Sequence, residues 1–218
     1  MDFVLVRITV FFIAMAFGFL PLIFYFYKEG FKNIKSKNIY FLYLVFITFC
    51  TVYELVFTSW LRINVIPFRI FYALADFLLL FFIISIQVRN TNKRLMYAIM
   101  IVYLLLYAYF VIHVNTIDFM VSDGYLSIII ILLLLYGFIS WLIDQFNNPR
   151  LETLTQAPFF WFISGVLIFY VPGVMLYILT EPLVLSEYSF GTLHIFNNIG
   201  LIIFRIFVSI AVWKGLVK

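Results

Sequence analysis

Seven long apolar stretches constrain the fold of this chain more than any other feature of its sequence. A helix needs about 20 mostly apolar residues to cross the hydrocarbon core of a bilayer. The stretches of that length are Phe3 to Tyr27, Ile39 to Trp60, Phe68 to Val88, Leu95 to Val114, Tyr125 to Ile143, Phe159 to Thr180 and Gly191 to Trp213. We therefore predict an all-α, polytopic integral membrane protein, a bundle of seven transmembrane helices that forms a single domain over residues 1–218.

The composition excludes an ordinary soluble domain. Of the 218 residues, 66% are apolar and only 11% are charged, whereas soluble domains carry about 25% charged residues. Nearly the whole chain falls into the apolar stretches, so no connection is long enough to hold a separate soluble domain. The only cysteine, Cys50, lies inside an apolar stretch, which excludes an intrachain disulfide.

Basic residues predict the orientation, because lysine and arginine resist transfer across the membrane. They gather on one set of alternate connections: Lys28, Lys32, Lys35, Lys37, Arg89, Lys93, Arg94, Arg150, Lys214 and Lys218. The other set holds little beyond Arg62. We expect the N-terminus outside, the C-terminus in the cytoplasm and a location in the inner (cytoplasmic) membrane. This charge is an orientation signal, so no nucleic-acid partner is expected.

Polar side chains inside the stretches point to a candidate site. An ionisable group deep in a transmembrane helix costs roughly 2.5–3.5 kcal/mol, so it needs a partner, a water-filled cavity or a function. Glu54 and Asp76 lie about 9 Å and about 12 Å from the outer ends of their helices, at 1.5 Å per residue. The seventh stretch places polar residues along one face: His194, Asn197, Asn198 and Arg205. Because helical side chains lean toward the N-terminus, we expect Arg205 to reach toward Asp76.

Two interpretations of this cluster remain open. In the first, Asp76 and Arg205 form a buried pair, and the asparagines make hydrogen bonds that only fix helix register. In the second, the cluster lines an outward-facing site for a ligand or a proton. Glu54 and Asp76 would then accept hydrogen bonds or titrate, with Arg205 as their counter-charge. His194 would donate a hydrogen bond or respond to pH, and Asn198 would orient the ligand.

Pro172 and Gly173 interrupt the sixth stretch. Proline lacks the N–H that continues a helix, so a kink is expected, either as static packing or as a hinge. Pro21 and Gly165 we assign to packing between helices.

The sequence predicts no cofactor and no catalytic activity. His113 and His194 lie at similar levels near the outer surface, so a haem or metal site is conceivable. Metal sites usually need three or four ligands, and no supporting motif accompanies the two histidines. The familiar patterns of zinc hydrolases, serine hydrolases and phosphate-binding loops do not occur in the sequence. Among enzymes, the only alternative left is an intramembrane enzyme that lacks all of these patterns.

Four of the stretches contain short patterns that occur in a distinctive order. Glu54 lies in YELVF and Asp76 in ALADFLLLFF, the sixth stretch opens with PFFWFISGVLIFYVPG, and the seventh begins with HIFNNI and ends with IAVW. In this order they resemble a group of seven-helix membrane proteins from Bacteroidota, found alone or as the membrane input region of sensor histidine kinases. The sequence ends at Lys218, shortly after the last stretch, so the resemblance implies a separate signalling partner, such as a histidine kinase.

These observations favour a sensory or regulatory membrane module that binds a small ligand or a proton. The alternatives are a small proton- or cation-coupled transporter and a scaffold subunit of a membrane complex. The longest cytoplasmic connection, Asp144 to Pro158, is the best candidate surface for a protein partner.

Overall fold

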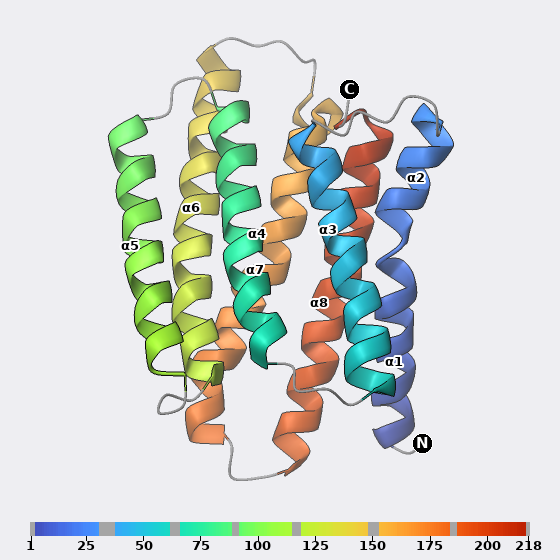
Figure 1. Ribbon diagram of the computed structural model, residues 1–218. Helices are drawn as coiled ribbons and strands as arrows, with labels where there is room; N and C mark the ends of the chain where they lie inside the picture. Colours follow the sequence, from blue (N-terminus) through green and yellow to red (C-terminus); the bar gives the residue numbers. More distant parts are fainter. Residues whose placement is uncertain are drawn as a thin grey trace. The chain divides into compact units, whose positions relative to one another are not determined.

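The fold is all-helical, as predicted. The computed structural model describes residues 3–30, 38–61, 66–88, 92–114, 119–147, 153–183 and 187–216, and these contain no strand (Figure 1). The helices are α1 (Phe3–Phe17), α2 (Leu20–Glu29), α3 (Ile39–Tyr53), the π-helix η2 (Glu54–Trp60), α4 (Ile66–Gln87), α5 (Lys93–Ile112), α6 (Phe119–Asn147), the 3₁₀ turn η3 (Leu154–Gln156), α7 (Pro158–Leu183) and α8 (Glu187–Trp213). Each predicted apolar stretch therefore lies on helical structure.

The helices identify a multi-pass membrane protein. Among the described residues, six segments are long and apolar enough to cross a membrane: Val4–Glu29, Ile39–Phe57, Ile66–Gln87, Lys93–Ile112, Ser122–Asn147 and Ile195–Trp213. α7 is 26 residues long, and the shorter part of it with described side chains, Pro158–Val174, is apolar as well. The apolar outer surfaces of such helices lie in contact with the lipid bilayer.

The helices pack into two compact units. Unit 1 consists of Met1–Ile63 and Thr155–Lys218, and it contains α1, α2, α3, η2, α7 and α8. Unit 2 consists of Asn64–Leu154, and it contains α4, α5 and α6. The single domain expected over residues 1–218 stays a prediction.

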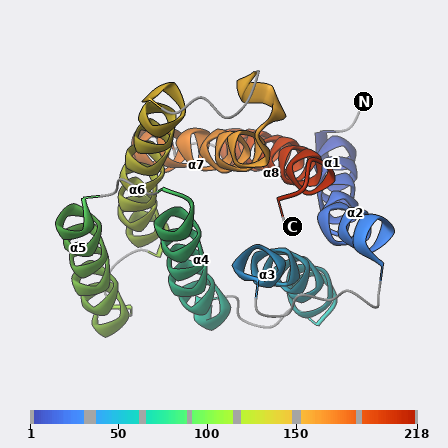
Figure 2. The same ribbon diagram turned by 90° about the horizontal axis from the view of Figure 1, so that it is seen from above.

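In unit 1, α8 is the central helix. It packs on α7 along one side and on α1 and α2 along another (Figure 2). A Cβ placed on Gly165 of α7 would lie 2.6 Å from the Cβ of Phe207 on α8, so only glycine allows this approach of the two helices. This contact agrees with the packing role expected for Gly165.

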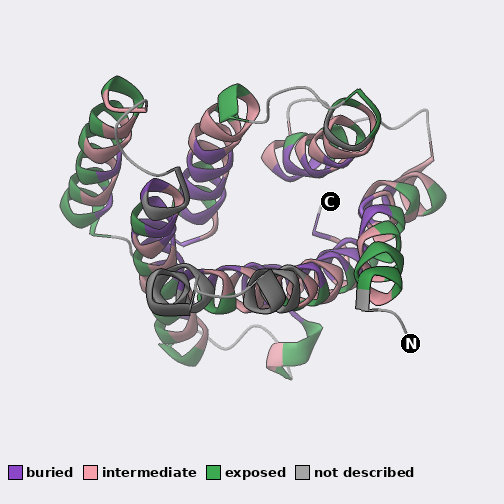
Figure 3. Ribbon diagram, turned by 90° about the horizontal axis from the view of Figure 1, so that it is seen from below, coloured by how far each residue is buried: buried purple, intermediate pink, exposed green. Residues whose placement is uncertain are grey.

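In unit 2, α6 packs on both α4 and α5. A Cβ placed on Gly137 of α6 would lie 2.6 Å from Cγ2 of Ile84 on α4, so these two helices are also in close contact. α5 buries only Met96 and Tyr103 along its described length, and most of its surface is exposed (Figure 3). This surface is apolar and suited to lipid.

The first predicted stretch forms two helices, because the chain makes a turn between α1 and α2. The Gly18 N–H donates to the Met15 carbonyl at 3.0 Å, and the Phe19 N–H donates to the Ala16 carbonyl at 3.3 Å. Both are 3₁₀-type bonds. Pro21, near the start of α2, has no N–H with which to continue the helical ladder. The turn corrects the prediction of one unbroken helix over this stretch.

The second predicted stretch changes from an α-helix to the π-helix η2. The Glu54 N–H donates to the carbonyls of both Cys50 and Thr51 at this change. Beyond it, the Leu61 N–H donates to the Val56 carbonyl at 3.0 Å, which is the five-residue spacing of a π-helix. π-helical turns are rare and often occur at functional sites. The position of Glu54 at the start of η2 therefore agrees with its choice as a candidate site residue.

The sixth predicted stretch is one continuous helix. α7 extends from Pro158 to Leu183 and passes through Pro172 and Gly173. A Cβ placed on Gly173 would meet no atom within 4 Å in the described part of the chain, so this glycine serves no close approach there. A hinge at Pro172 and Gly173 stays a prediction.

Candidate functional site

The six polar residues predicted to form one cluster belong to two different units. Asp76, on α4, belongs to unit 2. The members in unit 1 are Glu54, His194, Asn197, Asn198 and Arg205. His194 is part of α8, but its side chain lies outside the described residues. The predicted pair of Asp76 with Arg205 stays a prediction.

Arg205 is buried in unit 1 and bonds to two neighbouring helices. Its Nη1 donates to the carbonyl oxygen of Ala14 on α1, and its Nη2 donates to Oγ1 of Thr51 on α3 at 2.9 Å. Thr51 is fully buried, and its hydroxyl donates to the Ile47 carbonyl at 2.9 Å, so it accepts the arginine bond through a lone pair. We call Arg205, Ala14 and Thr51 the Arg205 junction.

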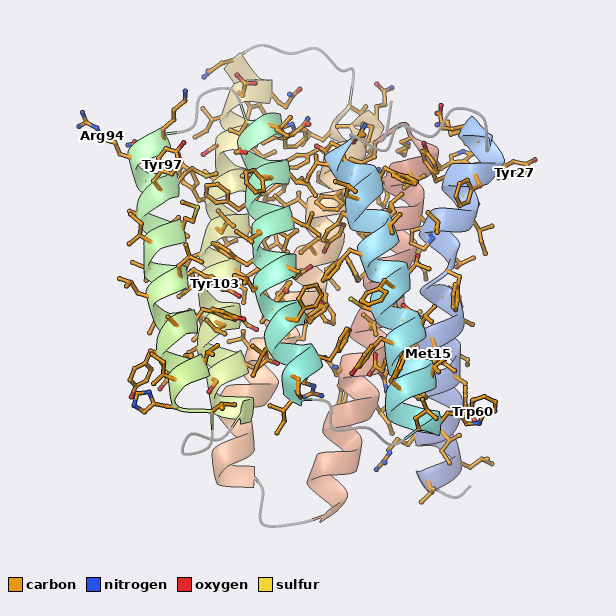
Figure 4. All side chains as sticks on the ribbon, in the orientation of Figure 1. Met15, Tyr27, Trp60, Arg94, Tyr97 and Tyr103 are labelled. Carbon is orange, nitrogen blue, oxygen red and sulfur yellow. The ribbon has the colours of Figure 1, made fainter. Side chains whose placement is uncertain are left out.

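The Ala14 carbonyl accepts this bond because of the turn between α1 and α2. In a continuous helix it would accept from the Gly18 N–H. That N–H donates to the Met15 carbonyl instead, and Arg205 supplies the replacement donor. Met15, which is labelled in Figure 4, follows Ala14 on α1 and is almost fully buried. Arg205 is recognisable in the sequence as a charge within an apolar stretch, whereas neither of its partners is predicted from the sequence.

The other unit 1 candidates lie on the helices that form the junction. Asn198 is buried and lies seven residues before Arg205, on the same face of α8. Asn197 is half-buried beside it. Glu54 is half-buried and lies three residues after Thr51, at the first position of η2. The polar face predicted for α8 is therefore directed into the protein at the two positions that are buried, Asn198 and Arg205.

In unit 2, Asp76 lies in a second group of polar side chains. Only 2% of Asp76 is exposed. Tyr103 extends from α5 to α4, where its hydroxyl donates to the Ala73 carbonyl at 2.6 Å (Figure 4). Its ring stacks on Phe77 with the centroids 3.6 Å apart. Asp76 and Asp123 both lie within electrostatic range of the Tyr103 hydroxyl, so a negative charge on either carboxylate would act on it.

A small cavity lies between α4, α5 and α6 next to this group. Its volume is about 20 Å³, which is enough for roughly one water molecule. The polar side chains in its wall are Tyr107, Ser122 and Asp123. The apolar part of the wall includes Ala73, one helical turn before Asp76. We call Asp76, Tyr103, Tyr107, Ser122 and Asp123 the unit 2 cluster.

The wall of the cavity is suited to a hydrogen-bond donor. The Tyr107 hydroxyl donates to the Ile70 carbonyl at 3.2 Å, so it offers the cavity an acceptor. An ionised Asp123 carboxylate is also an acceptor only. A water molecule or a proton fits this space, because each can interact with the oxygen acceptors of Tyr107 and Asp123.

Of the unit 2 cluster, only Asp76 is predicted from the sequence. Asp123 falls in a connection when the fifth apolar stretch is taken to begin at Tyr125. α6 begins earlier, at Phe119, so Asp123 lies inside the helix. The tyrosines gave no separate signal, since Tyr103 and Tyr107 belong to a helix rich in exposed aromatic and aliphatic residues.

The histidines do not form a recognisable metal site among the described residues. The Nδ1 atom of His113 lies 2.9 Å from the Tyr109 carbonyl, and the two rings are in contact with centroids 4.5 Å apart. Within the described part of the chain, no three histidine, cysteine, aspartate or glutamate side chains are placed to hold a metal ion.

Comparison with known proteins identifies no relative. No family model matches the chain, and neither a curated protein nor a solved structure is significantly similar to it.

Proposed function

We propose that this chain is a membrane-embedded sensory or regulatory module, which takes up a proton or binds a small polar ligand at the unit 2 cluster. The observation that carries the proposal is the buried Asp76 on α4, one helical turn after Ala73 in the wall of a water-sized cavity that also contains Asp123. A carboxylate at this depth costs roughly 2.5–3.5 kcal/mol. The cavity wall is mostly apolar, and its polar side chains are Tyr107, Ser122 and Asp123, so a proton or a water molecule would meet a carboxylate there.

In the proposed topology, the chain crosses the inner membrane seven times with the N-terminus outside. The basic residues on alternate connections support this orientation. The cavity lies where α4 begins, α5 ends and α6 begins, so it would be in the outer half of the membrane. A ligand or proton would then reach it from outside the cell.

The output would pass to a separate protein in the cytoplasm or the membrane. The connection after α6 supports this, because it contains η3, and the Trp161 indole N–H donates to the Thr155 carbonyl at 2.7 Å just after that turn. This bond orders part of the cytoplasmic surface against α7. A histidine kinase is the partner that the resemblance to membrane input regions implies.

The proton site is tested by infrared spectroscopy of the protein in lipid nanodiscs during steps of pH across the range in which carboxyl groups titrate. We expect a change in carboxyl absorption that Asp76→Asn and Asp123→Asn each reduce. Asp144→Asn is the matched control, because Asp144 is a buried carboxylate at the far end of α6. An unchanged signal in Asp76→Asn and Asp123→Asn would overturn the proposal.

Two further measurements separate the module from its alternatives. Capture of the protein from native membranes in mild detergent, followed by mass spectrometry, would support a module if it recovers a histidine kinase. Recovery of a structural complex would support a scaffold. Solute flux into liposomes driven by a pH gradient would support a transporter, and such flux should depend on Asp76.

A further inference from the structure

We infer that the Arg205 guanidinium replaces the missing backbone donor at the turn between α1 and α2, and that it connects this turn to α3. This inference concerns unit 1 and does not depend on the function proposed for unit 2. It assigns a positioning role to Arg205 and to Thr51, through the Arg205 junction.

The turn creates a need for a donor inside the membrane. Lipid offers no hydrogen bonds, so each backbone group that leaves the helical ladder must be satisfied by the protein. The Gly18 N–H bonds to Met15, which removes the usual donor from the Ala14 carbonyl. Arg205 donates to that carbonyl from Nη1. In membrane transporters, carbonyls at such breaks coordinate cations, and here the guanidinium takes that position.

The second bond of Arg205 fixes the turn in space. Nη2 donates to Thr51, and Thr51 is in direct contact with the turn, since a Cβ on Gly18 would lie 2.6 Å from its Cγ2. The planar guanidinium can hold two acceptors at once in a fixed geometry, which a lysine ammonium on its flexible stem does not provide. One buried side chain therefore ties α1, α3 and α8 together.

The burial of the charge agrees with this role. Arg205 is 3% exposed and lies in the middle of an apolar helix. Arginine at the centre of a membrane helix is costly unless it bonds to carboxylates, carbonyls or water. A buried arginine that donates to a carbonyl and a hydroxyl is thus retained for the contacts it makes.

Hydrogen exchange measured by mass spectrometry in nanodiscs tests the inference. We expect Arg205→Ala to speed exchange in the segment 14–22 by about tenfold or more, because the turn loses its donor. Guanidinium chloride, at a low and non-denaturing concentration, should restore part of the protection, since the free ion fits the space of the missing head group. Sodium chloride at the same concentration is the control. Equal effects of the two salts would overturn the cation role.

Conservative variants keep the test decisive if Arg205→Ala does not fold. Thr51→Val keeps the volume but removes the acceptor for Nη2, so exchange in segment 14–22 should rise. Thr48→Val is the matched control, because Thr48 lies on the same helix and its hydroxyl also donates to a carbonyl four residues back. Arg205→Lys should protect the segment less than arginine does. The inference is wrong if Thr51→Val and Thr48→Val behave alike.

Discussion

The contact between Gly18 and Thr51 sets how near the turn between α1 and α2 can lie to α3. A Cβ on Gly18 would lie 2.6 Å from Cγ2 of Thr51 and closer still to its hydroxyl oxygen. The clash would involve a side chain that is fully buried and bonded on both sides, to Ile47 and to Arg205. Thr51 therefore cannot move aside without loss of those bonds.

Gly18→Ala should accordingly destabilise the protein by about 1–3 kcal/mol, the usual cost of adding a methyl group to a tightly packed core. Gly173→Ala is the control, since a Cβ there meets no atom within 4 Å in the described residues. It should not lower the free energy of unfolding, because alanine is favoured over glycine inside a helix by about 0.5–1 kcal/mol. Unfolding in mixed detergent micelles measures both values. Equal stability of the two variants would contradict the close contact.

Two tyrosines of α5 differ in how much their hydroxyl groups should stabilise unit 2. Tyr103→Phe removes a fully buried bond of 2.6 Å to the Ala73 carbonyl and leaves the stack on Phe77 in place. We expect a loss of about 1 kcal/mol. Tyr107→Phe removes a longer, partly buried bond of 3.2 Å and should cost less. The same unfolding measurement compares them, and a larger loss in Tyr107→Phe would refute this ranking.

At the scale of helices, the sequence predicts where each helix lies along the chain better than it predicts which face of the helix is buried. Within the described residues, every α-helix overlaps with one of the apolar stretches, because length and hydropathy alone decide which segments can cross a bilayer. Which face of a helix is buried is harder to predict, since lipid is as apolar as the protein core. The turn at Gly18 and the π-helix that begins at Glu54 also escaped prediction. Both depend on hydrogen bonds, and the turn is fixed by partners on other helices.

The contact of α4 with α6 gives a prediction for a pair of helices. Gly137→Ala would place a methyl group 2.6 Å from Cγ2 of Ile84 and should destabilise unit 2 by about 1–3 kcal/mol. Ile84→Ala removes the atoms that clash, so the double variant should lose less stability than the sum of the two single variants. A double-mutant cycle measures this coupling, expected at roughly 0.5–3 kcal/mol. Additive losses would show that the two residues do not touch.

At the scale of the whole molecule, the sequence supplied part of the candidate site. Asp76 and Arg205 stood out because a charge in an apolar helix is expensive, and both are buried. Their partners did not stand out, because a carbonyl such as that of Ala14 carries no signal in sequence. Asp123 was missed for another reason: charged residues near a helix end resemble a connection until the start of the helix is known.

The proposed topology makes the prediction that concerns the whole chain. Single cysteines introduced in a Cys50→Ala background report which side of the membrane each position faces. Trp60 lies at the end of η2 and is 85% exposed, and Glu187 begins α8. We expect Trp60→Cys and Glu187→Cys to react with an impermeant maleimide in intact cells. Asn147→Cys and Lys214→Cys should react only after permeabilisation, because basic connections stay in the cytoplasm.

The position of Glu187 decides how many times the chain crosses. Asn147 ends α6, and the 26-residue α7 separates it from the start of α8. If α7 spans the bilayer, Glu187→Cys and Asn147→Cys must label on opposite sides, and seven crossings follow. Labelling on the same side would mean that α7 does not cross. Lys214→Cys and Asn147→Cys must label on the same side if α7 and α8 both cross, so labelling on opposite sides would mean that only one of the two helices crosses.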